Sequence, residues 1–394
     1  MVSKAPLEAP LKSSLLTIEK TQCPKDLVPL DNLGFGKTFT DHMIVCDWEK
    51  SKGWSSPRII PHQPFSLDPS SLVFHYGFEC FEGMKAYKDS QGRILLFRPE
   101  MNMRRLNLSA ARIALPTFDE TALLECISKL LILDSRWIPS KKGYSLYIRP
   151  AIIATENTLQ LRPSLSASLF VIASPVGSFY NSKSAPISLY ATSDCVRAWP
   201  GGLGDIKVGG NYASGIRPQL EAYQKGYDQI LWLFGAQRYV TEAGSMNCFV
   251  CWTTPHGQKQ LITAPLDGTI LPGVIRDSVL TLARERLAPR GWNVLETLFT
   301  LDDLILAASQ HRLLEVFGTG TAAVISSVRK IGYNGGEITL PAESWQAGSV
   351  ALTMHEWITE IQYGSVNHPW TYIVDPADTE TNTSTTLETA IPKP

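Results

Sequence analysis

The amino-acid sequence predicts a two-domain α/β protein, and three observations support this prediction. The chain has 394 residues, more than one hydrophobic core usually organises. Runs rich in β-branched and aromatic residues recur between segments of helical periodicity. A polar stretch of small residues over 176–182 follows two such runs. We therefore expect a flexible arm over residues 1–30, a smaller domain over 31–175, an interdomain loop over 176–186, a larger domain over 187–370 and a disordered tail over 371–394.

The smaller domain is predicted to combine strands with two helices. Pro99 opens the first helix and Pro116 ends it, because proline fits the first turn of a helix but breaks its interior. Residues 119–133 carry apolar side chains along one helical face and predict the second helix. The expected strands span residues 35–48, 84–87, 94–97, 144–153 and 168–173, and residues 59–67 are expected to form a loop or an edge.

The larger domain is predicted to begin with a strand over 187–191. A helix over 213–226 ends at a glycine, which is a common helix C-cap. The other expected helices start at residue 271, span 302–308 and span 343–363, and the other expected strands span 228–234, 239–252 and 314–324.

The composition excludes several classes of partner. The formal net charge is −1, without a long block of like charges, which argues against nucleic acid and against an anionic membrane surface. No apolar run reaches the roughly 18 residues of a membrane span. The N-terminal residues lack the apolar core of a signal peptide and the arginine-rich character of a strong transit peptide. We expect a cytoplasmic protein, with a weak mitochondrial presequence as the alternative.

The cysteine and histidine spacing predicts neither a disulfide framework nor a metal site. The seven cysteines are odd in number and irregularly spaced. Cys248 and Cys251 form a C-x-x-C pattern, but they lie in an apolar run, so we interpret both as residues of a buried strand. No second pair completes a zinc site, and the seven histidines show no ligand spacing.

A glycine-rich stretch over 201–215 surrounds a single lysine, Lys207, with Tyr212 shortly after it. Glycines let a backbone approach a ligand closely. A lysine in a partly dry site loses its proton more easily, and its amine can then form a Schiff base with a carbonyl compound. The alternative is a flexible surface loop with a solvated lysine, and the stretch alone fits both interpretations.

Two segments of the second half predict anion binding. At Val274 and Ile275, the start of a predicted helix presents free N–H groups and the positive end of the helix dipole. The segment Gly318-Thr-Gly-Thr-Ala-Ala323 fits the G-x-G-x-x-A pattern of dinucleotide-binding folds. Against a dinucleotide site, residues 324–328 continue the strand pattern instead of opening a long helix.

Three charged residues lie in apolar surroundings, where a buried charge needs a partner. Glu242 lies in a turn beside apolar strands, either as a cap or as the partner of a buried cation. Arg105 and Arg149 lie in a predicted helix and a predicted strand. A phosphate, a substrate carboxylate or a structural ion pair would each satisfy an arginine there.

Seven motifs carry a resemblance to a known family. In chain order they are Phe35-Gly-Lys-Thr-Phe-Thr-Asp-His42, Phe81-Glu-Gly-Met-Lys-Ala86, Ser145-Leu-Tyr-Ile-Arg-Pro150, Gly204-Asp-Ile-Lys-Val-Gly-Gly-Asn-Tyr212, Glu242-Ala-Gly-Ser-Met-Asn247, Pro272-Gly-Val-Ile-Arg276 and Gly318-Thr-Gly-Thr-Ala322. Together they resemble the branched-chain amino acid aminotransferases of eukaryotic type, which are fold-type IV pyridoxal-phosphate enzymes. The resemblance runs from about residue 35 to residue 363. It implies a homodimer of two-domain subunits, with a mixed sheet in the N-terminal domain and a barrel-like C-terminal domain with helices.

The resemblance also implies a role for each matched residue. Lys207 would hold pyridoxal 5′-phosphate as a Schiff base, Glu242 would face the pyridine nitrogen, and Tyr212 would bond the ring oxygen. The phosphate would be held by Arg105, the N–H groups of Val274 and Ile275, and a hydroxyl of Thr319 or Thr321. Thr321 and Ala322 would bind the substrate carboxylate, and Arg149 the second carboxylate of glutamate. The side-chain pocket would be lined by Phe35, Phe81, Tyr147 and Ser245, with Tyr76 and Leu161 from the other subunit.

The implied activity is transamination between leucine, isoleucine or valine and 2-oxoglutarate, which gives branched-chain 2-oxo acids and L-glutamate. It would follow a ping-pong cycle in which Lys207 moves the proton, in either biosynthesis or catabolism. One alternative is another fold-type IV enzyme, a D-amino-acid aminotransferase or an aminodeoxychorismate lyase, although the segments over 81–85 and 145–149 argue against both. A catalytically silent cofactor-binding protein is the other alternative, against which the intact Lys207, Tyr212 and Glu242 argue.

Two departures from the family pattern affect regulation and specificity. Ala323 and Ser326 stand where mammalian relatives carry a C-x-x-C pair, so we expect no thiol switch at that position. Ser245 and Leu161 replace the threonine and the smaller valine that are common in relatives. Both changes are expected to retune the pocket for the substrate side chain.

Overall fold

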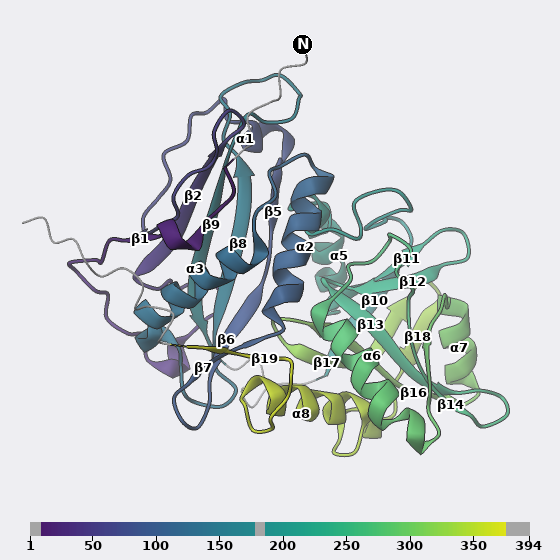
Figure 1. Cartoon of the computed structure of the whole chain (residues 1–394). Coiled ribbons are helices and arrows are strands. Elements are labelled where there is room, and N and C mark those ends of the chain that lie inside the picture. The colour runs from purple at the N-terminus through teal and green to yellow at the C-terminus, as the bar shows by residue number, and fades with distance from the viewer. Residues whose placement is uncertain (1–8, 178–185, 376–394) are drawn as a thin grey trace, which may run out of the picture.

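The structure, a computed structural model, describes residues 9–177 and 186–375. It has two lobes that lie side by side (Figure 1). The first lobe contains a ten-stranded sheet and the second a nine-stranded sheet. Residues 178–185, which form most of the expected interdomain loop over 176–186, lie outside the described residues.

The first sheet is largely antiparallel and has the strand order β1-β4-β2-β9-β8-β6-β7-β19, with β3 paired to β2 and β5 paired to β8. Helices α2 (Pro99–Arg112) and α3 (Glu120–Leu133) cover one face, and their buried leucines and isoleucines form the main core of the lobe with this face. The strands are β1 (Thr17–Ile18), β2 (His42–Glu49), β3 (Gly53–Trp54), β4 (Arg58–Pro61), β5 (Glu79–Phe81), β6 (Met84–Lys88), β7 (Ile94–Phe97), β8 (Ser145–Ala154), β9 (Ser166–Val176) and β19 (Thr371–Val374).

The second sheet closes on itself, in the order β12-β11-β10-β17-β16-β13 and back from β13 to β12. Closure removes the exposed edges that an open sheet would leave. This arrangement matches the barrel-like domain that the family resemblance implied. The strands are β10 (Ile187–Thr192), β11 (Gln229–Phe234), β12 (Tyr239–Ala243), β13 (Met246–Thr253), β14 (Lys259–Thr263), β15 (Asn293–Glu296), β16 (Leu313–Gly320), β17 (Val324–Tyr333) and β18 (Gly336–Thr339).

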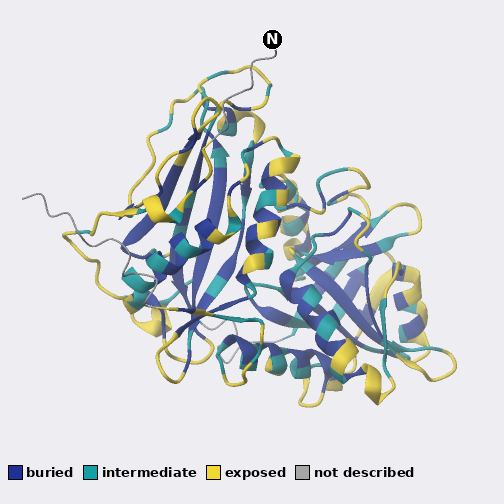
Figure 2. Cartoon of the chain, viewed as in Figure 1, coloured by how far each residue is buried: buried dark blue, intermediate teal, exposed yellow. Residues whose placement is uncertain are grey.

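Helices cover the outside of the second lobe, and their inner faces are buried while their outer faces are exposed (Figure 2). The apolar residues of α6 and α8 pack on one another and on β13 and β16. No helix among residues 9–177 and 186–375 is long and apolar enough to cross a membrane. The remaining helices are α1 (Leu72–Tyr76), α4 (Gly210–Ala213), α5 (Ile216–Gln224), α6 (Val274–Arg286), α7 (Leu301–Ser309) and α8 (Val350–Gln362).

Most predicted elements are present, and the differences occur where glycine redirects the chain. Residues 35–41, expected as the start of a strand, form a turn in which Gly36 has a φ of 66°, so β2 begins only at His42. The helix expected over 343–363 is divided into a short 3₁₀ turn and α8, and Gly348, with a φ of 93°, lies between them.

The dinucleotide-binding alternative is wrong. The segment over 318–323 does follow a strand, but the chain turns straight back into the antiparallel strand β17, in which Val324 faces Gly320. A dinucleotide fold requires a helix at this place, whose N-terminus receives the pyrophosphate. Cys248 and Cys251 both lie buried on β13, as the apolar run predicted.

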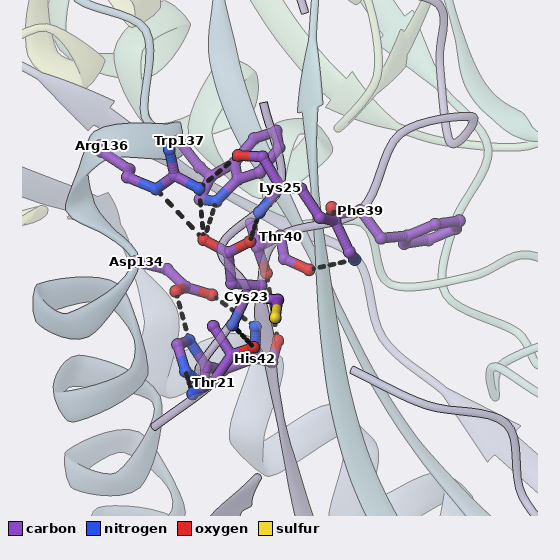
Figure 3. Close-up of polar contacts among 10 residues, drawn as sticks. Thr21, Cys23, Lys25, Phe39, Thr40, His42, Asp134, Arg136 and Trp137 are labelled. Atoms are coloured by element: carbon purple, nitrogen blue, oxygen red, sulfur yellow. Dashed lines mark hydrogen bonds and ion pairs between the residues drawn. The ribbon is translucent and has the colours of Figure 1, made fainter. Parts of the chain in front are cut away.

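Residues 9–30, expected as a flexible arm, instead make defined contacts with the first lobe. Strand β1 pairs with β4, and the backbone N–H of Thr21 donates to Nε2 of His42 at 2.9 Å (Figure 3). His42 in turn places its Nδ1 at 2.7 Å from the buried carboxylate of Asp134. The apolar and polar residues of this segment that contact the lobe show no helical or strand periodicity, so the contacts could not be predicted from the sequence.

A second part of this contact surrounds Asp41. Its buried carboxylate accepts hydrogen bonds from the backbone N–H of Lys25, the guanidinium of Arg136 and the indole N–H of Trp137. The Lys25 ammonium also donates to the Thr40 carbonyl at 2.9 Å (Figure 3). These bonds fix the chain between the turn at Gly36 and the start of β2.

The expected tail over 371–394 starts with a strand. Residues 371–374 form β19, which pairs antiparallel with β7 of the first lobe. The chain thus returns from α8 in the second lobe to the edge of the first sheet (Figure 1). Residues 376–394 lie outside the described residues.

Candidate active site

A cavity of about 930 Å³ lies between the two lobes, and both contribute side chains to its wall. Most of the residues predicted to bind substrate or cofactor lie in this one wall. They are Phe35, Phe81, Tyr147 and Arg149 from the first lobe and Lys207, Tyr212, Ser245, Thr321 and Ala322 from the second part of the chain. The volume of the cavity is in the range of small-molecule binding sites.

The backbone around Lys207 is attached to the first lobe. The backbone N–H of Lys207 donates to the Ser109 hydroxyl at 2.9 Å, and the Lys207 carbonyl accepts from the N–H of Phe81 at 3.0 Å. Gly209 allows this close approach, because a Cβ there would lie 1.6 Å from a carboxylate oxygen of Glu79. The glycine-rich stretch is therefore a packed segment rather than a solvated loop.

The Lys207 side chain points to Tyr212. Its Nζ lies 2.7 Å from the Tyr212 hydroxyl oxygen and 4.7 Å from the centre of the Phe81 ring. Burial, and then the positive charge of Arg105, lower the pKa of Lys207 to about 8. The amine is thus more readily available in its neutral, nucleophilic form than that of a surface lysine.

Tyr212 keeps its proton over the physiological range. Burial, and then the negative charge of Glu242, raise the pKa of the phenol well above its ordinary value. The Tyr212 ring packs against Phe81, with centroids 5.2 Å apart. A protonated phenol at a fixed position can donate a hydrogen bond to an anionic oxygen in the cavity.

Glu242 lies on β12 with both carboxylate oxygens engaged. Oε1 accepts from the Leu271 N–H at 2.9 Å and from the Asn247 amide at 3.1 Å, and Oε2 lies 2.9 Å from Nε of Arg197. Burial raises the pKa of Glu242, while the charge of Arg197 and the Leu271 N–H act to lower it. Of the two interpretations of Glu242, the structure supports the partner of a buried cation.

Arg105 is held at the start of α6. Its Nη1 donates to the carbonyl of Pro272 at 3.0 Å, and its Nε and Nη2 donate to the two carboxylate oxygens of Glu82 at 2.6 and 2.9 Å. These bonds use three of the five N–H groups of a guanidinium. Burial opposes the charge on Glu82, but the Arg105 cation outweighs it and lowers the pKa of Glu82.

The first backbone N–H groups of α6 lie beside this arginine. The helix begins at Val274 with no side-chain cap from Gly273, which leaves its N-terminal donors available to an anion. Val274 and Ile275 line a small pocket together with Gly83 and Thr321. The hydroxyl of Thr319 is buried and has no hydrogen-bond partner among the described residues.

The wall near the first lobe is aromatic and carries one cation. Phe35 packs edge-on against Tyr147, with ring centroids 4.9 Å apart. Arg149 donates from Nη2 to the Tyr147 hydroxyl at 3.0 Å, and its guanidinium lies 4.6 Å from the Phe81 ring centre. Among the described residues Arg149 forms no ion pair; it contacts a phenol and a ring face, and its charge also acts to lower the pKa of the Glu79 carboxyl.

Two predicted pocket residues lie away from the cavity of their own chain. Tyr76, at the end of α1, is 42% exposed, and its hydroxyl donates to the Leu159 carbonyl at 2.6 Å. Leu161 is 72% exposed. Their assignment to the cavity of a second subunit stays a prediction.

Sequence reasoning missed the charged partners of the predicted residues. Glu82 was visible in the Phe81-Glu-Gly motif, but its pairing with Arg105 joins the end of β5 to α2 and leaves no local pattern. Arg197 and Lys85 were also missed, and Met246 and Gln229 line the cavity without having been predicted. One sequence signal could have found these partners: a charged residue within an apolar run, as at Glu82 and Arg197, predicts a buried ion pair.

Fold and site together define a class of enzyme, and comparison with known proteins places the chain in it. The family described as "Amino-transferase class IV" matches residues 79–331, more than half of the chain. A lysine held near a tyrosine and a buried carboxylate, beside a helix start without a side-chain cap, fits this class.

Curated relatives define the particular family. The mitochondrial branched-chain-amino-acid aminotransferase of Schizosaccharomyces pombe is 48% identical over 374 residues, which cover 94% of this chain and 88% of the relative. The cytosolic enzyme of that name from Saccharomyces cerevisiae is 48% identical over 369 residues, 93% of this chain and 98% of the relative. The chain therefore belongs to the branched-chain-amino-acid aminotransferases, which confirms the predicted family and enzyme class.

Solved structures confirm the predicted fold. The branched-chain amino acid aminotransferase of Escherichia coli superimposes with a TM-score of 0.66 at 25% identity, over 84% of this chain and 99% of that one. The Thermus thermophilus enzyme in complex with N-(5′-phosphopyridoxyl)-L-glutamate superimposes with a TM-score of 0.63 at 25% identity, over 84% of this chain and 98% of that one.

Proposed function

We propose that the chain transfers the amino group of leucine, isoleucine or valine to 2-oxoglutarate in a ping-pong cycle, with pyridoxal 5′-phosphate bound through Lys207. The observation that carries this proposal is the position of the Lys207 amine. It faces the cavity between the lobes, lies 2.7 Å from a tyrosine that keeps its proton, and has a pKa lowered to about 8. Membership in the aminotransferase family supports the same reaction.

The donors of the site fit this cofactor. The start of α6, the adjacent Arg105 and the unpartnered Thr319 hydroxyl supply an anion site for the phosphate. In the proposed complex, the buried carboxylate of Glu242 would face a protonated ring nitrogen, and the protonated Tyr212 phenol would face the ring oxygen. When bound, the cofactor accepts the electrons of the substrate Cα–H bond.

The proposed work of the protein is to place charges and to move one proton. With substrate and cofactor bound, the Lys207 amine would take the proton from the substrate Cα and return it to the carbon on the far side of the amino nitrogen, two bonds away. Arg197 lies 2.9 Å from Glu242 and favours its ionised form, which in turn favours the protonated ring nitrogen. Tyr212 stabilises the neighbouring anionic oxygen by a hydrogen bond.

The cavity wall supports the proposed substrates. Thr321 and Ala322 lie in the turn between β16 and β17 and would bind the carboxylate shared by both substrates. Phe35, Phe81 and Tyr147 give an apolar surface for a branched side chain. Arg149, which bonds a phenol rather than a carboxylate, would receive the second carboxylate of glutamate.

A homodimer completes the proposed site. Two segments, α1 and the loop after β8, each expose large apolar side chains. Such a grouping is unusual for a free surface. Among these side chains are Phe74, Tyr76, Leu159 and Leu161. We infer that this surface meets a second copy and that Tyr76 and Leu161 of the partner subunit close the side-chain pocket. Sedimentation of the wild type and of a Leu161→Glu variant would test this, since a monomer that retains full activity contradicts it.

For the compartment, we propose the cytoplasm, with the mitochondrion as the alternative. Relatives of similar identity carry both designations, mitochondrial in Schizosaccharomyces pombe and cytosolic in Saccharomyces cerevisiae. Fractionation of cells that express the chain with a C-terminal tag would decide between them.

The experiment that tests the proposed function is a product profile. The purified protein is incubated with pyridoxal 5′-phosphate, 2-oxoglutarate and single amino acids, among them L-leucine, L-valine, D-alanine and L-lysine, and the 2-oxo acids are identified. We expect products from the branched-chain L-amino acids only. Activity restricted to D-alanine would favour a D-amino-acid aminotransferase.

Lys207→Ala should lose both the turnover and the visible absorbance of the bound cofactor, and an unchanged spectrum would contradict the role of this lysine.

A further inference from the structure

Lys85 is a lysine of the first lobe whose position the proposed reaction does not explain. It lies on β6, and its ammonium donates to the backbone carbonyl of Ala322 at 2.6 Å. No carboxylate among the described residues forms an ion pair with it. A partly buried charge without a counter-ion is costly, which indicates that this place has a use for the charge.

The target of this bond is the turn between β16 and β17. Thr321, Ala322 and Ala323 line the large cavity, whereas Lys85 lines the small pocket, which shares Gly83 and Thr321 with the cavity. The carbonyl and the N–H of one trans peptide unit point in opposite directions. Because Lys85 holds the Ala322 carbonyl, the N–H of Ala323 in the same peptide unit must point away from Lys85.

We propose that Lys85 is a positioning residue for carboxylate recognition: it fixes the Ala322–Ala323 peptide with its N–H directed to the cavity and places one positive charge behind the turn that receives the substrate carboxylate. The inference rests on the proposed function and deepens it. Lys85 acts through the turn and does not touch the substrate itself.

The charge of Lys85 also makes carboxylate binding depend on pH. Burial lowers the pKa of Lys85 to about 8, so its charge is present at neutral pH and is lost above that value. His355 of α8 interacts electrostatically with Lys85, and Tyr147 faces Lys85 in the register of β8. The same elements also carry Arg149 on β8 and Glu356, Glu360 and Tyr363 on or beside α8. His355 has a lowered pKa, first from burial and then from Lys85 itself, so it is neutral where Lys85 titrates.

The test measures binding of an unreactive carboxylate to the holoenzyme. Isothermal titration calorimetry with 4-methylvalerate is compared with its uncharged amide, for the wild type, Lys85→Met and Lys85→Arg. Lys88→Met is the matched control, because Lys88 lies on the same strand and also donates to a backbone carbonyl, that of Ser135, at 2.7 Å. Thermal unfolding and cofactor absorbance show that each variant is folded and loaded.

We expect Lys85→Met to weaken binding of the acid about tenfold at pH 7, the size of a lost charge-assisted hydrogen bond, and to leave the amide within about twofold. The difference in affinity between Lys85→Met and the wild type should shrink above pH 9. Lys207 is present in both proteins, so its own titration does not affect this comparison. Lys85→Arg should restore most of the affinity, and Lys88→Met should match the wild type. In steady-state assays, KM for leucine and for 2-oxoglutarate should rise more than kcat falls.

Three results would overturn the inference. They are equal loss of acid and amide, a loss that does not change with pH, and unchanged binding of the acid by Lys85→Met. Wild-type turnover of leucine is measured in the same preparations. If the wild type fails to turn over leucine, the proposed function fails; if it turns over leucine and Lys85→Met binds the acid normally, only the role of Lys85 fails.

Discussion

Glu82 and Arg105 form a buried, two-point ion pair, with Nε–Oε1 and Nη2–Oε2 distances of 2.6 and 2.9 Å. The Glu82 side chain is fully buried, and it also accepts from the Asn102 amide at 2.8 Å. This pair joins the end of β5 to α2 and orients the third nitrogen of Arg105 to the start of α6. The carboxylate therefore fixes the arginine that is proposed to bind the phosphate.

Glu82→Gln should destabilise the protein and weaken cofactor binding together. The substitution keeps the shape of the side chain but leaves the Arg105 charge buried without a counter-ion, which costs about 3 kcal/mol or more. Urea unfolding of the apo-protein gives the loss of stability, and equilibrium dialysis gives the affinity for pyridoxal 5′-phosphate. The matched control is Glu221→Gln, whose ion pair with Arg217 on α5 is exposed on both sides. An equally large loss in the control would show that the position of Glu82 is not special.

The rate of cofactor attachment should depend on pH with a midpoint near 8. Only the neutral Lys207 amine attacks an aldehyde, and burial together with Arg105 lowers its pKa to about 8. Since a lowered pKa makes the neutral form dominant above that value, the rate should rise about tenfold per pH unit below pH 8 and level off above it. Stopped-flow absorbance after mixing apo-protein with pyridoxal 5′-phosphate measures this rate. A rate that keeps rising to pH 10 would indicate a lysine of ordinary pKa.

Glu242→Ala should retain the cofactor but lose most of the reaction rate. The proposed anion site at α6 and Arg105 would remain intact, whereas the ring nitrogen would lose the carboxylate proposed to favour its proton, and Arg197 would be left without its partner. We expect a rate reduced on the order of a hundredfold, as for the loss of a preorganised electrostatic partner. Single-turnover kinetics with leucine separates this effect from binding. A double variant with Arg197→Met should be no slower than the single variant, because both changes act on the same ring nitrogen.

The sequence was most informative where function constrains neighbouring residues. Lys207 and Tyr212, five positions apart, were predicted as a pair, and their side chains are 2.7 Å apart. The helix beginning with Pro99 was predicted because proline gives a local signal, and α2 does begin there. The chain resembles its family through such local motifs, so part of the cavity wall could be predicted, whereas residues such as Met246 and Gln229 could not.

The sequence was least informative where partners come from distant segments. The carbonyl of Ala322 and the ammonium of Lys85 are separated by 237 positions, and no periodicity connects them. Arg197 is likewise paired with Glu242, although it lies in the segment after β10 and Glu242 lies on β12. Turn geometry caused the remaining differences, since the strand predicted from residue 35 begins only at His42, after the turn at Gly36.

Gly83→Ala should damage the substrate pocket through Tyr147. A Cβ at this position would lie 1.9 Å from the Tyr147 hydroxyl oxygen, far closer than any contact allows, so the ring must move. Tyr147 packs on Phe35 and accepts a hydrogen bond from Arg149, and displacement disturbs both contacts. We expect KM for leucine and for glutamate to rise at least severalfold and stability to fall by about 1–3 kcal/mol. Gly210→Ala is the matched control, since a Cβ there meets no atom within 4 Å.

Adding Arg149→Met to Gly83→Ala should raise KM for glutamate more than KM for leucine, because Arg149 is proposed to bind only the second carboxylate of glutamate. Equal increases in the two KM values would contradict that role.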